Sequence, residues 1–177
     1  MVRFAFAGLA MLTLVSPAAA EDDHGPELVA LFAKTCALRP ALPSELAKIV
    51  TGLGFVSDDK ISPDMEAGPK IDIVYRARFT RSGQNISLGA YFGESLDKLD
   101  VSCSLDTIGA SADALPGLIE KSLDAHDRTE QAANDGKRLV ASWHTGAAGS
   151  GDTIGLSAWR TSPQRSSINI TYHSRKK

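Results

Sequence analysis

The fold is decided by residues 71–105, which read IDIVYRARFTRSGQNISLGAYFGESLDKLDVSCSL. Apolar and polar residues alternate along three runs of this stretch, at 71–79, 86–92 and 99–105. A period of two residues predicts strands that bury one face, and the short turn-forming segments between the runs favour antiparallel pairing. The apolar sets are Ile71, Ile73, Tyr75, Ala77 and Phe79, then Ile86, Leu88, Ala90 and Phe92, then Leu99, Val101, Cys103 and Leu105.

The same alternation returns in three runs toward the C-terminus, which predict three more strands. Their apolar sets are Leu139, Ala141 and Trp143, then Ile154, Leu156 and Ala158, then Ile168, Ile170 and Tyr172. A glycine-rich segment at 146–151 and a turn-rich segment at 161–165 connect these runs.

Three further segments have the spacing of three and four residues that is typical of helices. The first follows Pro26 and includes Cys36 in its apolar stripe, the second begins near Pro43, and the third covers about Leu115–Ala125. Gly54 is expected to cap the second helix in a left-handed conformation. The polar segments 55–70 and 124–136 are predicted to be loops.

The element order is therefore α-α-β-β-β-α-β-β-β, and the fold class it predicts is α+β in two layers. About six antiparallel strands would form one sheet with the helices packed on one face. A small barrel or sandwich is the second choice. Strands begin roughly every fourteen residues in both halves, which suggests a diverged duplication. This order, in which helices are followed by antiparallel strands and the set is then repeated, resembles that of the secreted β-lactamase inhibitor proteins with tandem repeats.

The first twenty residues, Met1–Ala20, have the features of a secretory signal peptide. Arg3 gives a positive start, an uncharged apolar run follows, and Ala18-Ala19-Ala20 matches the pattern that signal peptidase cleaves. We expect the mature protein, 21–177, to be a single secreted α+β domain in the bacterial periplasm. The leader is too short to remain as an anchor, and no second run reaches membrane-spanning length.

Charge and cysteine content narrow the function classes. Loss of Arg3 leaves 18 basic against 21 acidic residues, a balance without the basic excess expected of a nucleic-acid-binding protein. Two cysteines, Cys36 and Cys103, both fall on apolar faces. In an oxidising compartment they are expected to form a disulfide, with two buried free thiols as the alternative.

Motifs for catalysis or cofactor binding are missing from the sequence. It has no G-x-S-x-G element, no C-x-x-C pair and no phosphate-binding loop that leads into a helix. The four histidines lack the spacing of a zinc site. We therefore expect no cofactor and no metal.

The polar side of the predicted sheet is the most suggestive surface. Its alternating positions include aromatic, arginine and histidine side chains, which are types enriched where proteins contact partners. An ordinary solvated sheet face is the competing interpretation. The candidate binding residues are Arg76, Tyr91, His144, Trp159 and His173.

These observations favour a non-enzymatic protein that binds another protein or a small ligand in the cell envelope. One alternative is a small hydrolase whose site assembles from distant residues, with Asp100 or Asp106 beside His144 or His173. Another is an envelope accessory protein without a discrete ligand site. A deep pocket that collects those groups would favour the enzyme, and an open face would favour the binding protein.

Overall fold

The structure is a computed structural model that describes residues 23–57, 62–63, 73–81, 86–94, 98–146 and 150–175. The predicted signal peptide, Met1–Ala20, lies outside the described residues. Within those residues, no helix is both long enough and apolar enough to cross a membrane.

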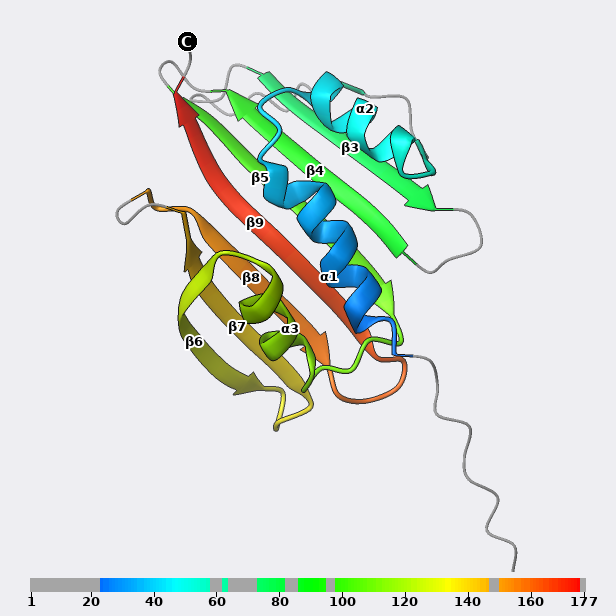
Figure 1. Cartoon of the computed structure of the whole chain (residues 1–177), viewed down its shortest axis with the longest axis vertical. Helices are drawn as coiled ribbons and strands as arrows, with labels where there is room; N and C mark the ends of the chain where they lie inside the picture. The colour runs from blue at the N-terminus through cyan, green and yellow to red at the C-terminus, as the bar shows by residue number, and fades with distance from the viewer. Residues whose placement is uncertain are drawn as a thin grey trace, which may run out of the picture.

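The strands form one antiparallel sheet in the order β1-β3-β4-β5-β9-β8-β7-β6, of which Figure 1 labels β3 to β9. The two-residue strand β2 pairs with β3 beside this path. β5 and β9 pair at its centre over eleven register positions, from Lys98 opposite Arg175 to Ile108 opposite Arg165. The strands are β1 (Phe55–Ser57), β2 (Ser62–Pro63), β3 (Ile73–Arg81), β4 (Ile86–Glu94), β5 (Lys98–Ile108), β6 (Ala125–Ala133), β7 (Arg138–Thr145), β8 (Thr153–Trp159) and β9 (Arg165–Arg175).

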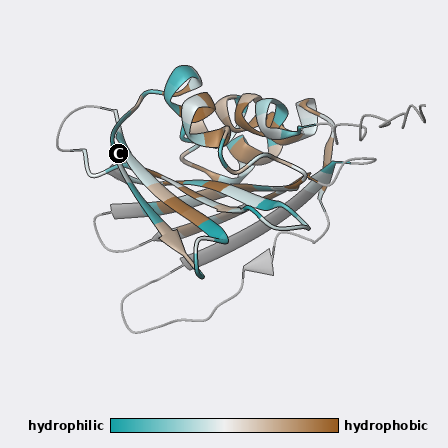
Figure 2. Cartoon of the chain, turned by 90° about the horizontal axis from the view of Figure 1, so that it is seen from below, coloured by the Kyte–Doolittle hydropathy of each residue, from teal (hydrophilic) through white to brown (hydrophobic). Residues whose placement is uncertain are grey.

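All three α-helices lie on the same side of the sheet (Figures 1 and 2). They are α1 (Gly25–Lys34), α2 (Pro43–Gly52) and α3 (Leu115–Ser122), and a single 3-10 turn η1 (Cys36–Leu38) follows α1. Gly54 has a φ of 82°, the left-handed conformation predicted for the end of the second helix. The two-layer α+β architecture predicted from the sequence is confirmed.

The core lies between the helices and the sheet, and it contains the apolar alternation that the sequence predicts. Residues 86, 88, 90 and 92 of β4 and residues 154, 156 and 158 of β8 are all buried. The helices contribute Leu28, Phe32 and Leu46 to the same cluster. The strand phase is therefore correct, because a slip of one residue would have turned these side chains to the opposite face.

Three strands fall in segments predicted to be loops, so the predicted count of about six strands is too low and the predicted element order omits these three strands. β1 and β2 lie within 55–70, and β6 occupies most of 124–136. β6 is exposed on both faces, so its sequence has no apolar alternation to reveal it. It is held instead by its backbone pairing with β7 and by a 2.7 Å hydrogen bond between the hydroxyls of Thr129 and Ser142.

Cys36 and Cys103 form a disulfide, as predicted, with their Cα atoms 5.4 Å apart. The bond joins the turn after α1 to β5, one of the two central strands. Both residues are completely buried. A disulfide is typical of proteins that fold in an oxidising compartment.

The two halves of the sheet have the same arrangement when each is followed inward from its own edge, β1 or β6. Each half has a helix, a strand at or near the sheet edge and a run of three neighbouring antiparallel strands, and the halves meet where β5 pairs with β9. The duplication predicted from strand spacing stays a prediction. The described strands form an open sheet that ends at β1 and β6, unlike the barrel or sandwich that was the second choice.

Candidate functional site

The side of the sheet away from the helices, here called the open face, displays polar side chains from the central strands. The pairing register of the strands gives the relative positions of the predicted binding residues on this face. Arg76 is opposite Tyr91, Tyr91 opposite Ser102, and Ser102 opposite Thr171. The row continues through Thr153 and His144 to His126.

Three of the five predicted binding residues, Arg76, Tyr91 and His144, therefore lie in one row across the sheet. For Arg76 this placement comes from the backbone register alone. Tyr91 lies over the backbone of Gly93, where an added Cβ would approach the phenol ring to 3.0 Å. His144 and His126 face each other on β7 and β6 with their ring centroids 6.3 Å apart.

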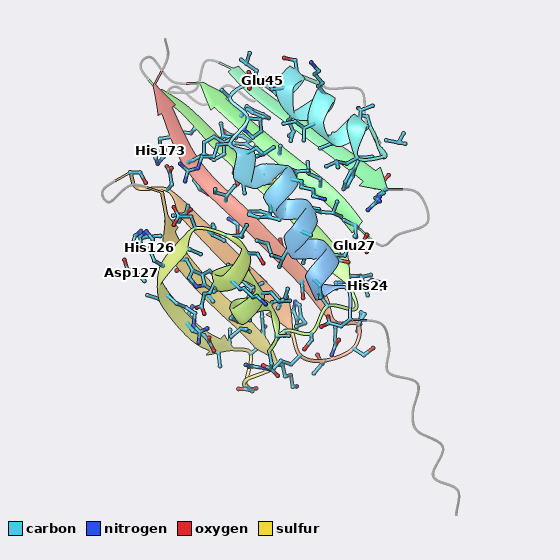
Figure 3. The ribbon with its side chains drawn as sticks, viewed as in Figure 1. His24, Glu27, Glu45, His126, Asp127 and His173 are labelled. Carbon is cyan, nitrogen blue, oxygen red and sulfur yellow. A yellow bond between two sulfur atoms is a disulfide. The ribbon has the colours of Figure 1, made fainter. Side chains whose placement is uncertain are left out.

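His173 lies beside this row on β9 and contacts one of the carboxylates that the enzyme hypothesis proposed. Its Nδ1 is 2.6 Å from Oδ1 of Asp100, its register partner on β5. Both side chains are about half exposed, at 48% and 51%. Figure 3 shows His173 on β9, with His126 and Asp127 separate from it on the edge strand β6. Asp100 and His173 therefore form one Asp–His pair of the kind that the hydrolase hypothesis requires.

A buried carboxylate supports the sheet end where His173 lies. Asp152 accepts an ion-pair contact from Arg39 at 2.9 Å, and its side chain is only 6% exposed. The backbone N–H of His173 donates to the same carboxylate at 3.4 Å. Next to it, the Tyr172 hydroxyl donates to the carbonyl of Pro40, and burial raises the pKa of that phenol far above its usual range. These contacts attach the turn after η1 to β9.

Trp159 lies at the other end of the open face, near the start of β9. The Arg138 guanidinium lies over the indole, 5.9 Å from the ring centroid, within the range of a cation–π contact. The Nε of Arg138 also donates to the hydroxyl of Ser157 at 2.8 Å. These contacts connect Arg138, Ser157 and Trp159 across the neighbouring strands β7 and β8.

Beside Trp159 an open groove of about 590 Å³ crosses the ends of several strands. Its size is in the range of small-molecule sites, which run from roughly 300 to 1,000 Å³. It includes Asp106 of the proposed catalytic residues, and neither Asp100 nor either proposed histidine contributes to it. The lining consists of Thr80, Ile86, Ser87, Asp106, Thr107, Ile108, Ser157, Trp159, Arg165, Ser166 and Ser167.

The five predicted residues therefore do not form a single site. Arg76, Tyr91 and His144 belong to one row by register, and His173 lies beside that row. Trp159 lies six residues further along β8 than Thr153 of the row, about 20 Å away. Sequence reasoning missed Arg138 and Arg165 as functional candidates. A signal was present for Arg138, which belongs to the polar alternation of its predicted strand. Arg165 falls in the segment 161–165 that is predicted to be a turn, whereas β9 begins at this residue.

Metal binding finds no support in the described part of the chain. There, no three histidine, cysteine, aspartate or glutamate side chains are grouped so as to hold an ion. The raised pKa of His126 has another cause: its ring bonds to the Asp127 carboxylate at 2.9 Å and contacts the carbonyl of Gly146.

Comparison with known proteins gives no relative from which to transfer a function. No protein-family model matches the chain, and no significant match is found among the curated proteins or the solved structures. The case for a function therefore depends on the geometry of the open face.

Proposed function

We propose that this chain is a secreted, periplasmic, non-enzymatic binding protein that holds an envelope or extracellular partner on the open face of its sheet. The observation that supports this best is the Trp159 groove, a polar hollow lined by the indole and by Arg165, with a second arginine, Arg138, against the indole. Tryptophan and arginine are the side chains that contribute most often to binding energy at protein surfaces.

The secreted location is supported by two independent features. One is the signal-like leader Met1–Ala20, and the other is the buried disulfide between Cys36 and Cys103. If the location is right, fractionation of the producing bacterium will find the protein in the periplasm with Glu21 as its first residue. A chain that retains Met1 and stays in the cytosol would refute it.

Binding on the open face is tested by cross-linked capture from an envelope extract, with the molecules retained identified by mass spectrometry. We expect Trp159→Ala to lose the captured molecule while its melting temperature stays within about 2 °C, since the indole contributes little to the core. The control is Lys121→Ala, an exposed residue of α3 in the helix layer, which should retain capture. Equal capture by both variants would remove the open face from consideration.

A small hydrolase is the second candidate, and the Asp100–His173 contact favours it. A carboxylate that accepts from imidazole Nδ1 orients the ring as a general base. If this pair is catalytic, the protein will hydrolyse p-nitrophenyl acetate and Asp100→Asn will lose at least 90% of the rate. Hydrolysis that is unchanged in this variant would leave the pair as a surface ion pair. A protein that neither binds nor hydrolyses would fit the accessory role.

A further inference from the structure

We propose that the Trp159 groove binds an acidic glycan strand, specifically a β-1,4-linked amino-sugar chain that carries a carboxylate on alternate rings, as cell-wall glycan does. The proposal rests on the proposed function, because it names the ligand of the same open face. It is argued from the floor of the groove, its aromatic edge and the positions of its cations.

The floor is a row of short polar side chains in register across five strands. Thr80 is opposite Ser87, Ser87 opposite Asp106, and Asp106 opposite Ser167. Ser157 completes the row on β8, opposite Ser167. Four strand spacings of about 4.8 Å give the row a length of roughly 19 Å. This floor is a narrow band of hydroxyls with one carboxylate, open to a ligand that runs across the strands.

The edge of the groove consists of longer side chains one step further along the strands. Ile108 is opposite Arg165, and the Ala158–Ser166 pairing sets Trp159 next to Arg165 on the neighbouring strand. Beyond Trp159 comes Arg138, its register partner on β7. An indole edge beside a hydroxyl floor suits a pyranose ring, which has an apolar C–H face for stacking and hydroxyl groups at its rim.

The cations at this edge are available for an anionic ligand. Among the described residues, neither Arg138 nor Arg165 forms an ion pair with a carboxylate. They lie on β7 and β9, two strand spacings or about 10 Å apart. Each ring of a β-1,4-linked glycan lengthens the chain by roughly 5 Å, which is about one strand spacing. Carboxylates on alternate rings are therefore about two strand spacings apart. This distance matches the separation of the backbone positions of Arg138 and Arg165.

The composition of the floor also separates a glycan from a protein ligand. Protein–protein interfaces are depleted in serine and aspartate relative to the remaining surface. The floor row consists only of serine, threonine and aspartate. A ligand rich in hydroxyl groups can form further hydrogen bonds with a row of this composition, whereas an apolar protein patch would cover the row without adding any.

The test is direct titration of the disulfide-bonded protein with peptide-free glycan strands from peptidoglycan, followed by calorimetry and tryptophan fluorescence. Chitohexaose is the matched ligand, because it has the same β-1,4 amino-sugar backbone without the lactyl carboxylate. We expect the glycan strands to bind at least tenfold more tightly than chitohexaose. We also expect increasing salt from 50 to 500 mM to weaken binding of the glycan strands alone.

The protein variants locate the ligand. Arg165→Ala should weaken glycan binding about tenfold, as expected for loss of a hydrogen bond to a charged group. Ser167→Tyr should block the floor, and Lys121→Ala, which removes one positive charge from the helix layer, should bind within twofold of the parent protein. Circular dichroism will confirm that each variant is folded.

Two results would overturn the proposal. If chitohexaose binds as tightly as the glycan strands, the carboxylate is not part of what the groove recognises. If neither ligand binds to folded protein, a glycan ligand is excluded altogether. The envelope capture described above keeps the two proposals apart. If a protein is retained there and lost in Trp159→Ala while neither glycan binds, the open-face function stands and only the glycan ligand is refuted.

Discussion

At the scale of single residues, the disulfide is the contact with the largest expected effect on stability. Cys36 and Cys103 are 67 residues apart in the sequence. Closing a loop of that size restricts the unfolded chain by about 4 kcal/mol in the chain-entropy model. Cys36→Ser should therefore lower the free energy of unfolding by about that amount in urea titrations, and Cys103 should become reactive toward iodoacetamide once the chain unfolds. If stability is unchanged and the parent chain reacts at both thiols, the disulfide is absent in solution.

A second residue-scale prediction concerns the buried carboxylate of Asp152. Arg39 is the ion-pair partner of this side chain and is itself partly exposed, at 36%. Arg39→Ala would leave a buried charge with fewer partners, so we expect a loss of about 2 kcal/mol in the free energy of unfolding. The double variant with Asp152→Asn should recover part of that loss, because the uncompensated charge is gone. Additive losses in the double-mutant cycle would contradict a direct interaction.

At the scale of elements, a histidine on the edge strand β6 is expected to make the stability of the protein depend on pH. The hydrogen bond from His126 to Asp127, aided by the Gly146 carbonyl, raises the pKa of His126 above 6.5. Because the folded state favours the protonated ring, its stabilising effect is complete below pH 6.5 and is lost as the pH rises through the raised pKa. NMR titration of the ring protons should show the shift, and Asp127→Asn should reduce it. A His126 pKa at or below 6.5 in the parent protein would show that this contact does not persist.

The elements that the sequence predicts correctly are those whose burial leaves a period in the chain. β4, β8 and β9 each alternate buried and solvent-facing residues, and α1 repeats buried residues at helical spacing. β6 has no such period because both of its faces are exposed, and its pairing with β7 depends on a partner that the local sequence does not reveal. Edge strands of this kind are therefore hidden from pattern analysis.

At the scale of the whole molecule, the candidate site depends on strand order, which local patterns cannot supply. The sequence predicts that Trp159 and Asp106 share the polar side of the sheet. Only the pairing of β5 with β9 brings their strands together at the groove, across a long separation in the sequence. The same pairing places His173 against Asp100. Side-chain type and face were predictable, and proximity was not.

The β5–β9 pairing also predicts how the chain unfolds. It joins the two halves of the sheet through eleven register pairs, and buried residues from both halves belong to one core cluster. Opening this seam would expose two long central strands, so neither half is expected to remain folded alone. Urea unfolding should therefore give one transition, with coincident midpoints by far-UV circular dichroism and by the fluorescence of the buried Trp143 on β7. Two separated midpoints would show instead that each half is stable by itself, as expected of two independent domains.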